Sequence, residues 1–97
     1  MFTIVRKFRL TRGSKQEVTR RVQDSFVPLL RELPGFRGYY LLDGGPDVLI
    51  SIRVFDSPEE ALASNEIAAD WIRNHVLEFV KGMPEVMAGE VLVAAAK

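Results

Sequence analysis

The sequence contains no cysteine, and it has only one histidine, His75, and one tryptophan, Trp71. Without cysteine there is no disulfide framework and no thiolate metal site. One histidine without a nearby pair of carboxylates or cysteines is a poor set of metal ligands, so we expect no metal site. The absence of thiols also fits a reducing compartment, and we expect the protein in the cytoplasm.

Net charge and long apolar runs are also absent. The chain carries 13 basic and 13 acidic side chains, so its formal net charge is zero. No global field attracts nucleic acid or an anionic membrane surface. No stretch approaches the roughly 20 apolar residues that span a bilayer, and the N-terminal residues 1–13 alternate apolar with basic side chains, unlike a signal peptide. We therefore expect neither nucleic acid nor a membrane among the partners.

The pattern of apolar residues predicts four strands within one domain over residues 1–97. The chain is short enough for a single core, and 47% of its residues are apolar. Apolar side chains at every second position predict a strand over 2–10. The runs 36–43 and 47–55 flank a Gly-Gly-Pro turn, which predicts an antiparallel hairpin. Residues 90–96 complete the set as a short last strand.

Two helices are predicted between these strands. Ser14 with Glu17 three residues later has the spacing of a capping box, and Pro28 predicts a kink or a loosened turn farther along the same helix. The apolar stripe of this first helix consists of Val18, Val22, Phe26, Leu29 and Leu33. The second helix is predicted to begin at Ser57, the residue before Pro58, and to run to about residue 80, before a glycine and a proline.

This order of elements predicts an α+β fold, the ferredoxin-like β-α-β-β-α-β arrangement with a four-stranded antiparallel sheet. Both helices cover one face of the sheet, so the other face is bare. We expect alternate residues from Val48 to Val54 to pack on the helices. The bare face then carries Tyr39, Leu41, Leu49 and Phe55 together with Arg37, Ser51 and Arg53. Such a face is too apolar to remain in water, which predicts a homodimer through the open sheet face.

At Leu33-Pro34-Gly35-Phe36, followed by an aromatic strand and a hairpin, the chain resembles the antibiotic biosynthesis monooxygenase-like (ABM) superfamily of dimeric α+β barrels. The resemblance spans nearly the whole chain and rests on element order, length and the Pro-Gly-Phe corner. It implies a homodimer with facing sheets and a pocket in each subunit between sheet and helices. The superfamily includes cofactor-independent oxygenases of polycyclic phenols and haem-degrading enzymes.

The chain departs from the functional motifs of that superfamily. Quinone-forming members use an asparagine and a tryptophan on the third strand, where this chain has Ser51 and Phe55. Haem-degrading members use a strand-one asparagine, where this chain has Phe8, and a tryptophan early in the second helix, which is also missing. Only His75 lies close to its counterpart. The resemblance therefore predicts no cofactor, although haem stays open.

The second helix carries three candidate site residues. Trp71 and His75 are four residues apart, so they share one flank of the helix and could hold a planar ligand. Histidine is the side-chain type used most often as a general base near neutral pH, so His75 is a candidate to accept a proton from a phenol. The alternative is that Trp71 seals an edge and His75 is solvated. Asn65 falls near the middle of the apolar face, where it could orient a ligand or satisfy backbone groups.

The strands carry further candidates. Arg6 interrupts the apolar alternation of the first strand, and Arg53 shares a sheet face with Tyr39 and Ser51. A guanidinium group inside a barrel needs a carboxylate, a phenolate or a bound anion to offset its desolvation. An anionic or phenolic ligand is one source of that charge. The other is a set of carboxylates across the dimer: Asp43, Asp47 and Glu90.

Two classes of function remain. The first is a cofactor-independent monooxygenase of a small aromatic or phenolic compound, with His75 as the catalytic residue. Its predicted ligand-binding residues are Asn65, Trp71, Ser51, Tyr39, Arg53 and Arg6. The second is a non-catalytic dimeric barrel that binds a small molecule or is purely structural. The sequence has no nucleophilic triad and no glycine-rich phosphate loop, so it gives little support to a hydrolase or a nucleotide-binding protein.

Overall fold

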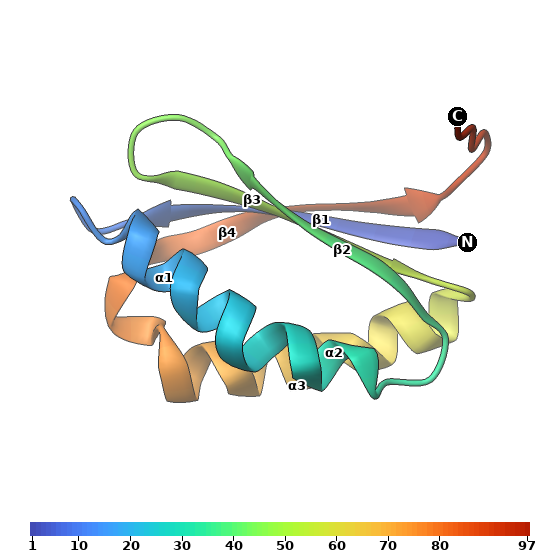
Figure 1. Cartoon of the computed structure of the whole chain (residues 1–97), viewed down its shortest axis with the longest axis horizontal. Coiled ribbons are helices and arrows are strands. Elements are labelled where there is room, and N and C mark those ends of the chain that lie inside the picture. Colours follow the sequence, from blue (N-terminus) through green and yellow to red (C-terminus); the bar gives the residue numbers. More distant parts are fainter.

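A computed structural model describes all residues, 1–97, and its four strands form one antiparallel sheet in the order β2-β3-β1-β4. The helices all lie on one face of this sheet (Figure 1). The elements are β1 (Phe2–Leu10), α1 (Lys15–Arg21), the π-helical turn η1 (Val22–Phe26), α2 (Val27–Arg31), β2 (Phe36–Asp43), β3 (Val48–Phe55), α3 (Pro58–His75), the 3-10 turn η2 (Leu77–Phe79) and β4 (Val80–Glu90). The predicted ferredoxin-like α+β fold is confirmed.

The first helical layer is one continuous rod that widens before its proline. Over η1 the backbone N–H of Val27 donates to the carbonyl oxygen of Val22, five residues back. Pro28 has no N–H, and its ring would crowd the carbonyl four residues earlier in a regular helix, so a wider turn at this place relieves both problems. The loosened turn expected at Pro28 is therefore present. Leu30 is fully buried in place of Leu29, which is 36% exposed and was wrongly predicted to face the core.

The two helix starts differ in their caps. The predicted capping box at Ser14 is wrong, because the Ser14 hydroxyl donates to the carbonyl oxygen of Thr11 at 2.7 Å and gives no cap bond. Glu17 instead pairs with arginines of its own helix. The predicted start of α3 is confirmed, since the Ser57 hydroxyl accepts a hydrogen bond from the backbone N–H of Glu60 at 3.2 Å.

The predicted last strand is wrong in position. Helix α3 ends at His75, and β4 already runs from Val80 to Glu90. An edge strand tolerates Pro84, and Gly82, with φ of 68°, lies where the pairing of β4 with β1 shifts register. Glu90 pairs with Phe2 at the very start of β1, so residues 92–97 have no strand beside them. The end of the chain projects away from the sheet (Figure 1).

The two faces of the sheet are the reverse of those predicted. The buried residues of β3 are Leu49, Ser51, Arg53 and Phe55, and they point toward the helices. Ile52 and its alternate neighbours lie on the open face, where Tyr40 of β2 is 62% exposed. The two alternating sets of side chains on β3 are both largely apolar, so the prediction depended on placing Arg53 outward. That choice put the wrong set against the helices. Arg37 is exposed and pairs with Asp56 at 3.3 Å.

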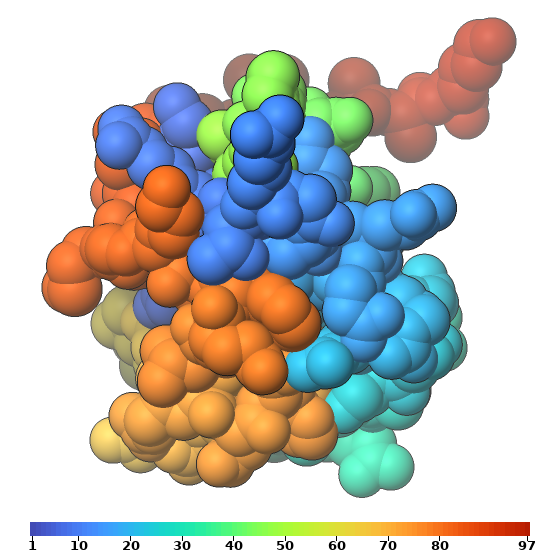
Figure 2. All heavy atoms as spheres, turned by 90° about the vertical axis from the view of Figure 1, so that its left-hand side faces the viewer, coloured from blue at the N-terminus to red at the C-terminus, as the bar shows by residue number.

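One end of the helical layer is closed by three segments that are distant in sequence (Figure 2). The turn after β1, the β2–β3 hairpin and the segment after α3 meet there. The backbone N–H of Leu10 donates to the carbonyl oxygen of Asp47, and that of Thr11 to the carbonyl oxygen of Phe79, both at 2.8 Å. These bonds fix the sheet against the helices at this end. None of the helices combines the length and the apolar character needed to cross a membrane.

Candidate functional site

A cavity lies between the helical layer and the inner face of the sheet. Its volume is about 50 Å³, and 13 of its 16 lining residues are hydrophobic. This space holds only a few water molecules. The lining residues are Arg6, Phe8, Leu10, Val18, Val22, Phe26, Tyr39, Leu41, Leu49, Ser51, Arg53, Ala68, Trp71, Ile72, Val76 and Val80. All four strands contribute lining residues, and α1, η1 and α3 cover the cavity.

Three aromatic rings form one wall of the cavity. Phe26 of η1 meets Tyr39 of β2 edge to face, with ring centroids 5.6 Å apart, and lies 4.9 Å from the ring of Trp71. The indole N–H of Trp71 donates to the hydroxyl of Ser25 at 2.9 Å. This bond ties α3 to the widened turn η1. The wall is thus a continuous aromatic surface of the kind that packs against planar ligands.

Two arginines from neighbouring strands form the polar part of the site. The Nη2 atoms of Arg6 and Arg53 donate to one oxygen, Oδ1 of Asn65, at 3.1 and 2.9 Å. Nη1 of Arg53 also donates to the Ser64 hydroxyl, whose own proton goes to the carbonyl oxygen of Ala61 at 2.6 Å. Only 1% of Arg53 is exposed. The three residues Arg6, Asn65 and Arg53 are called the arginine cluster below.

The strand register explains how the cluster forms. On β1 and β3, Arg6 lies opposite Ser51, and Ile4 lies opposite Arg53. Ser51 and Arg53 are two residues apart and share the inner face, so the two arginines are diagonal neighbours on adjacent strands. Asn65 reaches both from α3 above them. The small side chain of Ser51, which is buried, leaves room beside Arg6 at the cavity.

The charges of the arginine cluster are not compensated by any carboxylate. None of the ion pairs of the chain includes Arg6 or Arg53. Burial first, and then the nearby charge of Arg6, lower the pKa of Arg53 to about 10. Burial also lowers the pKa of Arg6. The Nε atom of Arg6 is buried without a hydrogen-bond partner. Such groups are rare in folded proteins because they are unfavourable.

Tyr39 also lines the cavity, and burial raises the pKa of its phenol above the usual range despite the charge of Arg53. The phenol therefore stays protonated at neutral pH. The ionisable residues among the lining set are Arg6, Arg53 and Tyr39. None of them is a general base at neutral pH.

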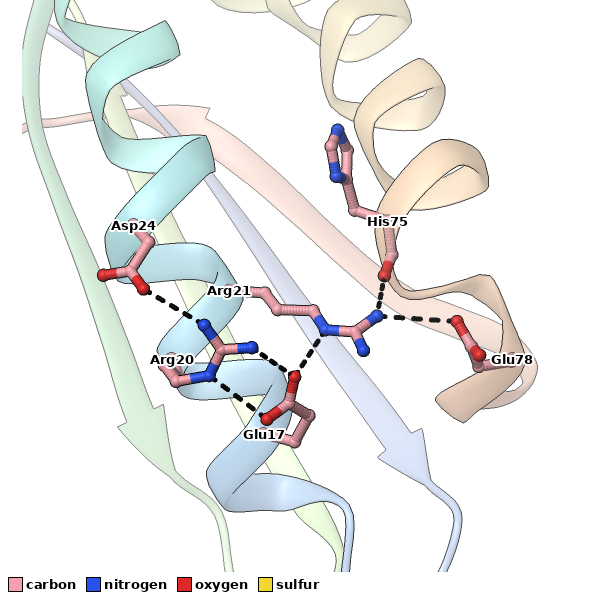
Figure 3. A network of polar contacts seen from close by, with 6 residues as sticks. All are labelled: Glu17, Arg20, Arg21, Asp24, His75 and Glu78. Atoms are coloured by element: carbon pink, nitrogen blue, oxygen red, sulfur yellow. Dashed lines mark hydrogen bonds and ion pairs between the residues drawn. The ribbon is translucent and has the colours of Figure 1, made fainter.

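His75 lies outside the cavity. Its side chain is exposed, and its ring stacks on Trp71 with centroids 5.0 Å apart and planes inclined by 21°. Figure 3 shows the imidazole turned away from the polar network beside it, while the backbone carbonyl of His75 accepts a hydrogen bond from Nη1 of Arg21 at 2.5 Å. His75 thus backs Trp71 from the outer side. Its catalytic role stays a prediction.

The network in Figure 3 joins the two helices at this place. Nε of Arg21 pairs with Glu17 at 2.7 Å, and its Nη1 lies 3.6 Å from Glu78. The same guanidinium group lies 5.0 Å from the ring centre of Phe79. Glu17 also pairs with Arg20 at 2.5 Å, and these two arginines lower the pKa of the Glu17 carboxyl to about 2. In contrast to the arginine cluster, every cation here has a carboxylate beside it.

The structure brings five of the seven predicted site residues to the cavity, and Asn65 bridges the two arginines at its edge. The five are Arg6, Tyr39, Ser51, Arg53 and Trp71. Sequence reasoning missed Ser25, Ser64 and Phe26 as site residues. Ser64 belongs to a stripe with Ala61 and Ala68 at helical spacing, a signal that was visible if small polar residues were counted as buried.

The residues around the cavity do not fit a haem. Iron needs an axial ligand, and the single histidine is not among the lining residues. Tyr39 is held in its neutral form by burial, which disfavours the phenolate that would bind iron. No group of three or more His, Asp or Glu side chains is placed to hold a metal ion.

Similar folds occur in several solved structures. A protein of unknown function from Nitrosomonas europaea, NE2512, aligns with a TM-score of 0.82 and 18% identity over 99% of this chain and 93% of its own. A monooxygenase of Streptomyces coelicolor from the gene ActVA-Orf6, solved with the ligand nanaomycin D, aligns with a TM-score of 0.76 and 14% identity. The alignment covers 99% of this chain and 91% of that one. A MhuD mutant with two manganese protoporphyrin IX molecules per active site aligns with a TM-score of 0.78 and 19% identity, over 100% of both chains.

These three likenesses establish the fold. No curated protein matches the sequence. The model of the family described as "Antibiotic biosynthesis monooxygenase" matches residues 1–69, which include β1, the first helical layer, the β2–β3 hairpin and the first two thirds of α3. The match therefore contains the arginine cluster and most of the cavity wall. The chain belongs to the antibiotic biosynthesis monooxygenase family.

Proposed function

We propose that this protein is a cofactor-independent monooxygenase of a small aromatic or phenolic compound, which it binds in the cavity between the helices and the sheet. Family membership supports oxygen chemistry in general. The observation that carries the substrate class is the wall of Phe26, Tyr39 and Trp71, which presents aromatic faces and edges to an otherwise apolar space. Planar aromatic compounds pack favourably on such a wall.

A substrate of this kind needs more room than about 50 Å³. The helical layer is the part that can supply it, because η1 already departs from regular helical geometry at Phe26. Turns of this type often occur at functional sites. Binding therefore separates η1 and Trp71 from the inner face of β3.

The proposed reaction inserts one oxygen atom of O₂ into the ring and releases the other as water. A phenol with a free ring position and O₂ then yield a quinone and one water molecule, and the phenol supplies the electrons. No lining residue is a base at neutral pH, so the phenolic proton leaves to solvent. The two guanidinium groups stabilise the resulting phenolate.

The test is oxygen consumption by the purified protein with a panel of one- to three-ring phenols, with no metal or cofactor added. The proposal expects uptake of O₂ and a quinone product that carries one ¹⁸O atom when ¹⁸O₂ is supplied. Chelation by EDTA is expected to leave the rate unchanged. Binding of the phenols without oxygen uptake would refute the proposal.

A second candidate is a non-catalytic small-molecule-binding barrel. The observation that favours it is the absence of a general base in the cavity, together with the exposed position of His75. This alternative predicts that a bound phenol is recovered unchanged after aerobic incubation. A His75→Ala variant tests the predicted catalytic role of His75 separately, since unchanged turnover would remove that residue from the catalytic set.

The proposed assembly is a homodimer through the open sheet face. One row of apolar side chains crosses all four strands on that face, in the order Tyr40, Ile52, Val5 and Met87. Met87 is 70% exposed and Tyr40 62% exposed in the single chain. Contiguous apolar surface of this kind marks an interaction site. Sedimentation at micromolar concentration tests it, and a monomer there would contradict it.

A further inference from the structure

In the arginine cluster two positive charges, one of them fully buried, lie beside each other without an anion. Arg6 and Arg53 share a single neutral acceptor, the oxygen of Asn65, and their remaining partner is the Ser64 hydroxyl. Five N–H groups belong to each guanidinium. Of the ten N–H groups on the two arginines, three donate the hydrogen bonds described above, and the buried Nε of Arg6 has no hydrogen-bond partner. The cluster therefore has donors to spare beside an apolar cavity.

Carboxylates of the protein do not supply the missing charge. Asp43 pairs with Lys15 at 2.6 Å, Asp47 accepts from the backbone N–H of Gly13 at 3.1 Å, and Glu90 lies 3.4 Å from the N-terminal amine. A second copy on the open sheet face cannot reach Arg53, because that side chain points to the helices and is 1% exposed. Carboxylates of a second copy, which the sequence suggested as partners, would lie on the other side of the sheet from the cluster.

We propose that the ligand of this cavity carries a delocalised oxyanion, a carboxylate or a phenolate, which binds between the guanidinium groups of Arg6 and Arg53. This inference deepens the proposed function, since it specifies the substrate class for the same cavity. It does not require turnover, because binding alone compensates the charge. Arginine suits this role because its planar fork pairs with two oxygen atoms at once.

The geometry gives the ligand an orientation. The anionic group lies at the strand side of the cavity, beside Ser51, which is small and buried. The aromatic body extends toward Phe26 and Trp71 on the helix side. Asn65 acts as a positioning residue, since its one oxygen holds an Nη2 atom of each arginine. Burial first, and then the charge of Arg6, lower the pKa of Arg53, which means that both disfavour its charged form. A bound anion would offset this effect.

The test compares benzoate with benzamide, which have the same shape and differ in charge. Trp71 is the only tryptophan and lines the cavity, so its fluorescence reports binding. We expect benzoate to bind more tightly by about tenfold or more. In a second arm, 4-nitrophenol, which ionises near neutral pH, is titrated by its absorbance, and binding is expected to lower its pKa. Preference for benzoate identifies a carboxylate site, and the shift of nitrophenol identifies a phenolate site.

Variants assign the effect to the cluster. Arg53→Met and Arg6→Met are each expected to remove the preference for benzoate, whereas Arg37→Met, which changes an exposed arginine paired with Asp56, leaves it intact. Circular dichroism checks the fold of each variant, and the wild-type comparison does not depend on them. Equal affinity for benzoate and benzamide with no shift for nitrophenol, or no binding of any probe, would overturn the inference. Oxygen uptake is measured separately, so that a binding site without oxygenase activity is recognised.

Discussion

Each of the two faces of the sheet departs from the usual pattern in its own way. A typical sheet buries apolar side chains under its helices and shows polar ones to water. Here the helix-covered face buries Arg53 and part of Arg6, and the open face carries Ile52, Tyr40 and Met87. Both departures are unfavourable for an isolated chain without ligand. The difference is the basis of both proposals, an anionic ligand that completes the inner face and a second copy that covers the outer one.

The largest expected effect concerns the open face. Ile52→Lys places a charge in the middle of the apolar row, and in a symmetric dimer two such charges approach each other. We expect association to weaken by at least about a hundredfold, which corresponds to about 2.8 kcal/mol. Sedimentation equilibrium measures it. The matched control is Glu66→Lys on the exposed side of α3, which should leave the assembly unchanged. An Ile52→Lys protein that stays dimeric would place the interface elsewhere.

The next effect concerns the inner face. Arg53→Met removes a buried charge that no carboxylate offsets, while Asn65 keeps its bond from Arg6 and Ser64 keeps its bond to Ala61. We expect the free energy of unfolding to stay the same or to rise by up to about 2 kcal/mol, as for other buried charges replaced by apolar side chains. The preference for benzoate over benzamide is expected to be lost in the same variant.

Urea denaturation measures this change in stability. Arg37→Met serves as the control, because an exposed ion pair contributes only about 0.5 kcal/mol. A loss of more than about 2 kcal/mol for Arg53→Met would mean that Arg53 is a structural residue. The inner face of the sheet would then need no ligand to offset its buried charge.

A smaller effect is expected at the aromatic wall. Trp71→Phe keeps a ring next to Phe26 but removes the hydrogen bond to Ser25. We expect a loss of about 1 kcal/mol in the free energy of unfolding. Ser25→Ala should lose a similar amount, and the double variant should lose less than the sum, as two partners in one bond do. Strict additivity in this cycle would show that the bond does not couple α3 to η1.

The smallest effect contrasts a compensated charge with the arginine cluster. Arg20 and Arg21 lower the pKa of Glu17 to about 2, below its ordinary 4.5. Because the folded-state value is depressed, the stabilisation is present above the ordinary pKa and disappears as the pH falls through about 2. Glu17→Gln should therefore lose less stability than wild type between pH 5 and pH 2. Thermal unfolding across this range measures it, and parallel curves would contradict the assignment.

The fold was predictable from the sequence because its signals are local. Alternation marked β1, the glycine pair marked the hairpin and Ser57 marked the start of α3. The end of α3 and the start of β4 were not predictable, because Gly82 and Pro84 are residues that break most strands. They are tolerated here because β4 is an edge strand with a register shift at this place. Such tolerance depends on the neighbouring strand, which local sequence does not specify.

The sequence identified several residues that line the cavity, but not which face of the sheet they occupy. Arg6, Arg53 and Trp71 were identified because they interrupt apolar patterns or are unique in the chain. The face of β3 was assigned incorrectly, since a rule that directs charge outward fails where a guanidinium group is buried, as it is at Arg53. The exposure of His75 depends on where α3 ends, and that boundary was not fixed by periodicity.

The central claim is that the buried arginine pair exists to bind an oxyanion of the ligand. A crystal structure of the protein with 4-bromobenzoate tests it most directly, because the anomalous signal of bromine locates the ring independently of the carboxylate. The account predicts carboxylate oxygens in hydrogen-bond contact with Arg6 and Arg53, and bromine near Phe26 and Trp71. A carboxylate bound elsewhere, with both guanidinium groups unchanged around Asn65, would contradict it.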